Sequence, residues 1–306
     1  MALQGSNLPR KEEVDSIKIA VRRVKDTQTK QKAASIEEAL PDDTKRAVKQ
    51  AQEKAASNWL SALPLSDQGF TLNKGEFRDA LAIRYNHNLR SLPSKCPCGQ
   101  RYSLDHALNC KRGGFVSMRH NNVRDFEANL LQQVCKDVET EPPLQPLDGE
   151  SISGLQEDGA RPDIRARGFW RPGQNAYFDV RLTNVNCSSQ KHLTSERIFA
   201  KHEAEKKREY NQRIMNVEHG SFTPLIYSLN GGMGPECEKF HKQLALKIAE
   251  KTGERYSDVI SIIRCKLSFM ILRACLMSVR GSRPHSPNDA YTGGDFHNAC
   301  VNSRLN

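Results

Sequence analysis

The stretch RPDIRARGFWRPGQNAYFDVRLTNV, residues 161–185, decides the fold class of this chain. Two runs with the character of extended strands, 163–170 and 176–185, flank the segment 171–175, whose Pro-Gly-Gln-Asn composition is typical of a turn. We therefore predict a β-hairpin over this stretch.

Helices and one further strand surround the hairpin in the predicted order α, β, β, α, β, α, α. The spacing of apolar residues predicts a helix over 121–134, and a charged helix is predicted over 196–215. A buried strand is expected at 222–229, and two more helices at 235–251 and 256–280. The sequence thus predicts an α/β domain.

Two further segments have a biased composition. Residues 137–158 contain seven acids, no base and several Pro and Gly, so we expect an acidic connecting loop that faces away from nucleic acid. Residues 1–60 are rich in Lys, Glu, Gln and Ala but carry few apolar residues in register. They form either a helical arm that needs a partner or a partly disordered, solvated arm.

The chain is basic, with a formal net charge of +10, which favours polyanionic partners such as nucleic acid. Residues 90–124 hold seven basic residues against one acid, and residues 261–283 hold five against none, so we expect two basic patches. The nine irregularly spaced cysteines favour a reducing compartment over a disulfide scaffold. Charges interrupt the most apolar segment, 259–279, and no secretion signal is visible, so we expect neither a membrane partner nor secretion.

Cys96, Cys98, His106 and Cys110 form the pattern C-x-C-x7-H-x3-C. Three thiolates and one imidazole suit tetrahedral zinc. If residues 103–109 are helical, His106 and Cys110 lie on one face of that helix. Only one residue separates the first two cysteines, which is fewer than structural zinc sites usually have, so incidental cysteines near a helical histidine are the alternative.

Asp163 and Asp179 are candidate ligands for a catalytic magnesium ion. Paired strands lie about 4.8 Å apart, so the hairpin can bring the two carboxylates close enough to share a divalent cation. Hydrolysis of a phosphodiester needs an activated water and neutralised phosphate charge, which oxygen-bound metal ions provide. Strand alternation places Arg181 on the same face as Asp179. The alternative is a surface Pro-Asp turn and an unrelated strand aspartate.

A candidate catalytic cation comes from the helix predicted after the hairpin. Lys206 and Tyr210 are four residues apart and share a face, with Lys207 beside them. A lysine from this helix could reach the hairpin acids, and the alternative is a solvated face of mutually paired charges.

The remaining candidates flank the acid pair along the sequence. Glu127 is a candidate third magnesium ligand. His120 is expected either to cap its helix or contact a DNA phosphate, or to act as a catalytic group. Arg112, Arg119 and Arg161 are expected to contact nucleic acid.

The order of these features resembles the C-terminal region of site-specific non-LTR retrotransposon polyproteins. There a Cys-Cys-His-Cys zinc module precedes a restriction-like endonuclease of the PD-(D/E)xK class. The resemblance covers roughly residues 60–280 and implies a restriction-endonuclease-like mixed sheet flanked by helices. It implies a zinc module at 61–115 and an endonuclease domain at 116–285, and we expect a helical or partly disordered arm at 1–60 and a disordered tail at 286–306 outside it.

The resemblance also implies a function, namely a metal-dependent endonuclease that nicks target DNA. Its cofactors would be structural zinc and catalytic magnesium or manganese, its partners DNA and element RNA, and its location nuclear or nucleocytoplasmic. Arg181 departs from the lysine of the family pattern, and a guanidinium cannot shuttle a proton. The polymerase signature of such elements is absent from the sequence, so we expect a truncated or domesticated copy without reverse transcriptase. The alternatives are a catalytically inactive nucleic-acid-binding zinc protein and a zinc-stapled interaction module.

Overall fold

The computed structural model describes residues 11–145 and 161–283, and the chain divides into two compact units, one up to Lys49 and one from Gln50. The Cys-Cys-His-Cys segment belongs to the second unit together with the predicted hairpin. The boundaries expected after residues 60 and 115 do not coincide with this division. The tail at 286–306 and most of the predicted acidic loop lie outside the described residues.

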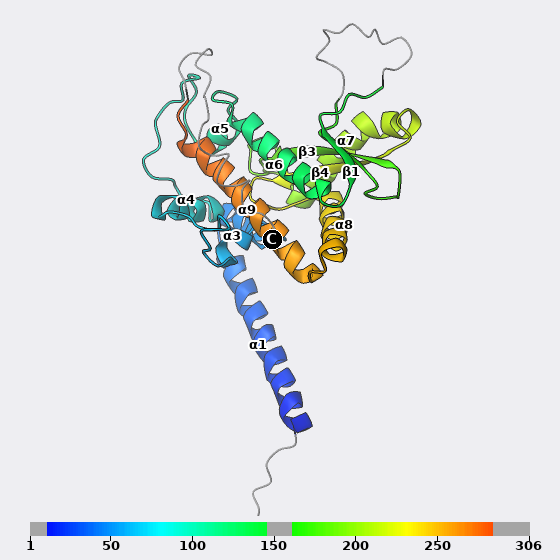
Figure 1. Ribbon diagram of the computed structural model, residues 1–306. Helices are drawn as coiled ribbons and strands as arrows, with labels where there is room; N and C mark the ends of the chain where they lie inside the picture. Colours follow the sequence, from blue (N-terminus) through cyan, green and yellow to red (C-terminus); the bar gives the residue numbers. More distant parts are fainter. Residues whose placement is uncertain (1–10, 146–160, 284–306) are drawn as a thin grey trace, which may run out of the picture. The chain divides into compact units, whose positions relative to one another are not determined.

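The first unit is helical. It contains α1 (Lys11–Ala39) and most of α2 (Asp42–Gln52), which continues into the second unit (Figure 1). Asp42 and Asp43 lie in the first turn of α2, where the partial positive charge of the helix N-terminus stabilises acids.

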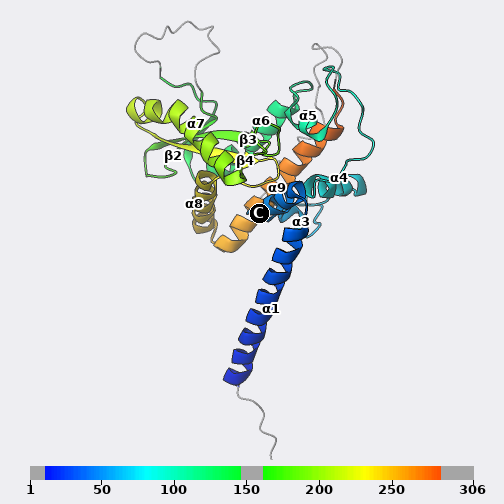
Figure 2. The ribbon, with the colours of Figure 1, turned by 180° about the vertical axis from the view of Figure 1, so that it is seen from behind.

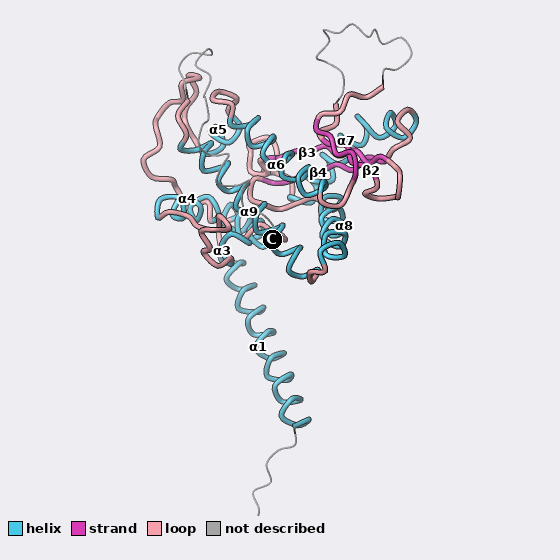
Figure 3. The backbone as a smooth tube through the Cα atoms, viewed as in Figure 1, coloured by secondary structure: helices cyan, strands magenta, loops and turns pink. Residues whose placement is uncertain are grey.

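The second unit is built on a four-stranded sheet with the order β1 (Lys136–Thr140), β2 (Ile164–Arg167), β3 (Asn175–Thr183), β4 (Ser221–Ser228) (Figure 3). The pairs β1–β2 and β2–β3 are antiparallel, whereas β3–β4 is parallel. A parallel pair requires a crossover, and the helix α7 (Ser195–Asn216) supplies it. The predicted α/β class and the mixed sheet flanked by helices are therefore confirmed.

Helices cover both faces of the sheet. Because side chains alternate along a strand, Phe178 and Val180 of β3 pack in the main core with α6 (Phe115–Gln132), α8 (Pro235–Thr252) and α9 (Tyr256–Arg280), while Tyr177 packs against α7. Figure 2, seen from behind, shows α7 on the face opposite α6. The other helices of this unit are α3 (Asn58–Ser61), α4 (Lys74–Arg84) and α5 (Leu104–Asn109).

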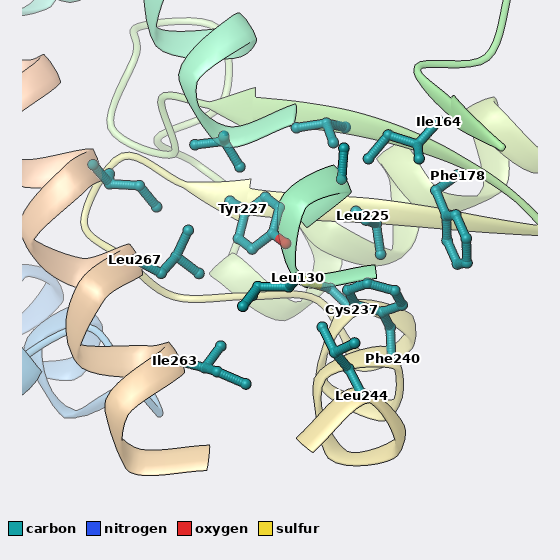
Figure 4. Packing of buried hydrophobic residues seen from close by; sticks show 14 of the residues in the cluster. Leu130, Ile164, Phe178, Leu225, Tyr227, Cys237, Phe240, Leu244, Ile263 and Leu267 are labelled. Atoms are coloured by element: carbon teal, nitrogen blue, oxygen red, sulfur yellow. The ribbon is translucent and has the colours of Figure 1, made fainter. Parts of the chain in front are cut away.

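The main core lies between the sheet and the helices α6, α8 and α9. Leu225 of β4, Phe240 of α8 and Ile263 of α9 meet there (Figure 4). Burying each such side chain contributes about 1.5–3 kcal/mol. The opposite side of α9 packs in a second core, where Phe269 joins Trp59 of α3. The helix α9 thus connects the sheet to the helices that precede the cysteine segment.

The predicted hairpin is confirmed, since β2 pairs with β3 from Ile164 opposite Phe178 to Arg167 opposite Asn175. Two expectations are corrected. The helix predicted from residue 121 begins at Phe115, directly after Gly114, which adopts a positive φ of 71° as its N-cap. The predicted acidic loop begins with a strand, β1, because its backbone pairs with β2 along the edge of the sheet.

Candidate functional site

Asp163 and Asp179 meet at the open end of the hairpin. Asp163 immediately precedes β2, and Asp179 lies in the middle of β3. Ile164 and Phe178 form the last pair between β2 and β3, so Asp163 lies just beyond this pairing, and its carboxylate reaches the backbone of Val180, next to Asp179. Asp179 shares its face of the sheet with Tyr177, which packs against α7. Asp179 therefore lies on the α7 face, whereas the carboxylate of Asp163 lies at the edge of the hairpin and contacts His120 of α6.

The carboxylate of Asp163 is held by both of its oxygens. The backbone N–H of Val180 donates to Oδ2 at 2.6 Å, and Nε2 of His120 lies 2.9 Å from Oδ1. Hydrogen bonding to Asp163 raises the pKa of His120, although burial opposes the shift. Because α6 begins after Gly114, His120 is not a helix cap, and its position joins α6 to the acid pair.

The carboxylate of Asp179 faces Lys206 of α7. The ammonium Nζ lies 3.3 Å from Oδ1 and 3.2 Å from Oδ2. Burial, together with the negative charge of Asp163, raises the pKa of Asp179 to about 7, although Lys206 opposes this. Burial disfavours the charge on Lys206, yet Asp179 and Glu209 more than offset this, so its pKa is raised. The site thus contains a carboxylate, Asp179, whose negative charge is disfavoured, beside an ammonium, Lys206, whose positive charge is stabilised.

The other two cations predicted near this site have different partners. Arg181 Nη1 donates to Oε2 of Glu205 at 2.9 Å, and Nδ1 of His202 lies 3.0 Å from the same oxygen. Lys207 pairs with Glu236 at the start of α8. Arg181 is therefore tied to α7, and Lys207 points away from the acid pair.

Tyr210 lies beside Lys206 as the helical spacing predicted. Its hydroxyl donates to the backbone oxygen of Arg161 at 3.1 Å, and Nζ of Lys206 lies 5.2 Å from its ring centroid. Burial raises the pKa of Tyr210, so its hydroxyl keeps its proton at neutral pH. Tyr210 thus fixes the segment that leads into Asp163.

Glu127, predicted as a third magnesium ligand, lies in the core instead. The hydroxyl of Tyr227 donates to its Oε1 at 2.8 Å, and Nε2 of His241 lies 2.9 Å from the same oxygen. All three side chains are fully buried. Tyr227 points into the main core and Asp179 to the opposite face of the sheet, so the position of Glu127 does not support the expected role.

The three arginines expected to contact nucleic acid differ in exposure. Arg161 is exposed directly before the acid pair, and Arg112 is partly exposed before α6. Arg119 is only 3% exposed, and its guanidinium donates to the backbone oxygen of Leu108 at 3.1 Å. The expected nucleic-acid contact of Arg119 is therefore wrong, because a buried arginine that joins α6 to α5 cannot reach a phosphate.

Cys96, Cys98, His106 and Cys110 converge as predicted, with one donor atom of each lying within 4.8 Å of the others. The Sγ atoms of Cys96 and Cys110 are 3.9 Å apart, and Cys98 Sγ is 3.3 Å from His106 Nε2. This Cys3His set could bind zinc. Across 11–145 and 161–283, no other group of three or more Cys, His, Asp or Glu donors gathers so closely.

Local backbone geometry explains how the short C-x-C spacing forms this set. The N–H of Gly99 donates to the oxygen of Cys96, and Gly99 adopts a φ of +92°, which a residue with a side chain rarely does. The chain thereby turns back within a few residues. Ser103 then caps α5 by accepting from the N–H of His106, which places His106 and Cys110 one helical turn apart.

A hollow of about 440 Å³ lies between the cysteine segment and the end of α9. Its lining includes Lys95 from the first predicted basic patch and Arg280 from the second. The guanidinium of Arg280 also donates to the backbone oxygens of Arg90 and Ser91 at 2.9 and 3.2 Å. The fold therefore joins two basic segments whose proximity the sequence did not indicate.

No protein-family model matches this chain, and no curated protein matches it. Within the described helices, none has both the length and the apolar stretch that crossing a bilayer requires. The interpretation of the site therefore depends on its own geometry.

Proposed function

We propose that this chain is a metal-dependent DNA endonuclease that hydrolyses phosphodiester bonds. The observation that carries the proposal is the acid pair at the end of the hairpin, where the charge of Asp163 acts on Asp179 and Lys206 contacts Asp179. The mixed sheet and its crossover helix suit a restriction-like fold.

The residues present fit a hard divalent cation. Magnesium needs only one or two protein carboxylates, because waters and substrate phosphates complete its shell. The buried Oδ2 of Asp179 accepts no hydrogen bond and has the ammonium of Lys206 as a charged neighbour, 3.2 Å away. His120 and Lys206 each contact one acid, and a bound cation would compete with both contacts. Magnesium and manganese are the candidates, since both accept carboxylate oxygens.

Each side chain has a proposed task. Asp163, oriented by Val180 and His120, and Asp179 hold the cation, which when bound neutralises phosphate charge and activates water. Lys206 supplies a positive charge beside the attacked phosphate, as the lysine of the family pattern would from the position of Arg181.

The context of the site motivates the choice of substrate. The net charge of +10 and the convergence of two basic patches at Arg280 favour a polyanion. The order of the cysteine set, the acid pair and Lys206 supports an origin in a non-LTR retrotransposon, with element RNA as a second partner and a nuclear location. Zinc in the cysteine set would be structural, since four protein ligands leave no open position.

A plasmid assay tests the proposal. Wild-type protein with magnesium or manganese should convert supercoiled plasmid to the nicked form. The variant Asp163→Asn/Asp179→Asn should be at least about 100-fold slower, because losing the cation removes several kcal/mol of charge stabilisation. Asp258→Asn, the same change on a partly exposed acid at the start of α9, should cut at the wild-type rate.

The two neighbouring lysines of α7 provide a second comparison within the same assay. Lys206→Ala should slow nicking at least about tenfold, the size expected for one lost charge contact, whereas Lys207→Ala should not. Undiminished cleavage by the double aspartate variant would show that the nicking activity belongs to another site or to a contaminant.

A catalytically inactive nucleic-acid-binding protein is the second candidate. Two contacts favour it. The ion pair with Lys206 occupies the carboxylate of Asp179, and the hydrogen bond to Glu205 holds Arg181 against α7. Salt-dependent DNA binding by the wild type, without cleavage in either metal, would support this function.

A further inference from the structure

The helix α1 carries a row of apolar side chains that face solvent. Ile17, Val21 and Val24 are 60%, 47% and 56% exposed. With Val14 they follow a spacing of three, four and three residues, which places them along one side of the helix. We name Val14, Ile17, Val21 and Val24 the α1 seam. A lone helix depends on packing of its apolar side for most of its stability, so the seam needs a partner surface.

The two edges of the seam differ in charge. On one edge lysines recur every seven residues, and we name Lys18, Lys25 and Lys32 the lysine edge. The opposite edge carries small, neutral residues at the same interval, namely Ala20, Thr27 and Ala34. Lys18 pairs with Asp15 at 3.4 Å on an exposed surface, where such a pair is weak. Among the described residues, Lys25 and Lys32 have no ion-pair partner.

A second copy of α1 fits this surface poorly. In a parallel pair, the lysine edge of one helix meets the neutral edge of the other, where only Glu13 supplies an acid. In an antiparallel pair, the two lysine edges face each other, which is repulsive. A nucleic acid fits no better, because phosphate binding leaves the apolar seam in water.

We propose that the α1 seam is a docking site for an amphipathic helix of another protein whose edge residues are acidic. Apolar side chains of that helix cover the seam, and its glutamates or aspartates lie against the lysine edge. This proposal does not depend on nuclease activity, since it concerns only the first unit.

Two synthetic peptides test this surface in the full chain. Both have about four heptads with Ile and Leu at the a and d positions, and they differ only in carrying Glu or Lys at e and g. Like charges keep each peptide from pairing with itself. The Glu peptide should bind at least about tenfold more tightly than the Lys peptide in fluorescence anisotropy, and salt should weaken its binding.

Three variants locate the contact. Val21→Ser/Val24→Ser should weaken binding of the Glu peptide at least about tenfold, because the apolar contact is lost. Lys25→Glu/Lys32→Glu should reverse the preference toward the Lys peptide. Arg22→Glu/Arg23→Glu makes a matched charge reversal away from the seam and should leave the preference unchanged.

Other outcomes would overturn the proposal. Absence of Glu-peptide binding, or binding that Val21→Ser/Val24→Ser leaves unchanged, would exclude a docked helix. Dimers in sedimentation that the same serine variant dissociates would identify a second copy as the occupant. Loss of DNA binding on Lys25→Glu/Lys32→Glu, without any peptide binding, would identify a nucleic-acid contact. Plasmid nicking should be equal in all of these variants.

Discussion

At the scale of single residues, the charged form of Asp179 destabilises the folded protein. A carboxylate ordinarily ionises with a pKa near 3.8, but burial and the charge of Asp163 raise that of Asp179 to about 7. Lys206 offsets only part of this cost. Such a shift is typical of a group kept for its chemistry rather than for stability.

Asp179→Asn should therefore stabilise the protein, and more so at higher pH. Because the folded pKa exceeds the unfolded one, the folded state binds more protons between pH 3.8 and about 7, so Asp179 reduces stability as the pH rises through this range. An asparagine does not titrate. In thermal melts without divalent ions, the advantage of Asp179→Asn over the wild type should be larger at pH 8 than at pH 4.5.

A matched change elsewhere separates this effect from a general loss of negative charge. Asp258→Asn removes a partly exposed carboxylate at the start of α9, so it should not reproduce the growing advantage of Asp179→Asn at higher pH. An advantage of Asp179→Asn that shrinks as the pH rises would contradict the assigned direction of the pKa shift.

At the scale of secondary-structure elements, a buried polar cluster joins α6, β4 and α8. Glu127, Tyr227 and His241 contact one another within 3.2 Å, and none is exposed. Buried polar groups are stable only while their hydrogen bonds are made, so removing one member leaves the others unpaired. The cluster therefore fixes how two helices pack on one strand.

Glu127→Ala should lower the free energy of unfolding by several kcal/mol, because Tyr227 and His241 each lose a buried hydrogen-bond partner at a cost of about 1–3 kcal/mol. Glu127→Gln, which keeps the shape and an acceptor oxygen, should cost less. Losses from Glu127→Ala and His241→Ala should add to more than the loss in the double variant, because the two side chains share one contact. Urea unfolding measures all of them, and Glu139→Ala on the exposed edge strand should cost about 1 kcal/mol or less.

Elements that a short sequence pattern defines could be predicted from the sequence. Elements that depend on contacts with segments far away in the sequence could not. The turn at 171–175 and the period of two along β3 sufficed to predict the hairpin and the shared face of Asp179 and Arg181, both of which meet side chains of α7. The strand β1 was not predicted, because its residues are polar and because the strand with which it pairs, β2, follows only after the intervening loop. Glu127 was predicted as a metal ligand, because no local pattern in the sequence indicates that Tyr227 of β4 and His241 of α8 would meet it in the core.

At the scale of the whole second unit, the cysteine segment is bound to the rest of the fold at several points. The hydroxyl of Tyr102 donates to the backbone oxygen of Val279 at 2.6 Å, and Asn184 donates to Asp105 of α5 at 2.9 Å. Arg283 donates to the backbone oxygen of Ala107 and stacks on the ring of Tyr102. The segment is thus continuous with the sheet and α9 rather than an appended module.

Loss of metal from the Cys3His set should consequently destabilise the whole unit in one transition. Purified protein should contain about one zinc per chain, and Cys110→Ser should lose it, since a structural site of this kind needs all four ligands. Chelation and Cys110→Ser should each lower the melting temperature without a separate early transition, because Tyr102 and Asn184 couple the site to the core. Cys187→Ser, outside the set, should keep both zinc and stability.

Zinc-free protein that melts at the wild-type temperature would refute a structural metal at the Cys3His set. A separate early transition would show that the cysteine segment unfolds independently of the sheet.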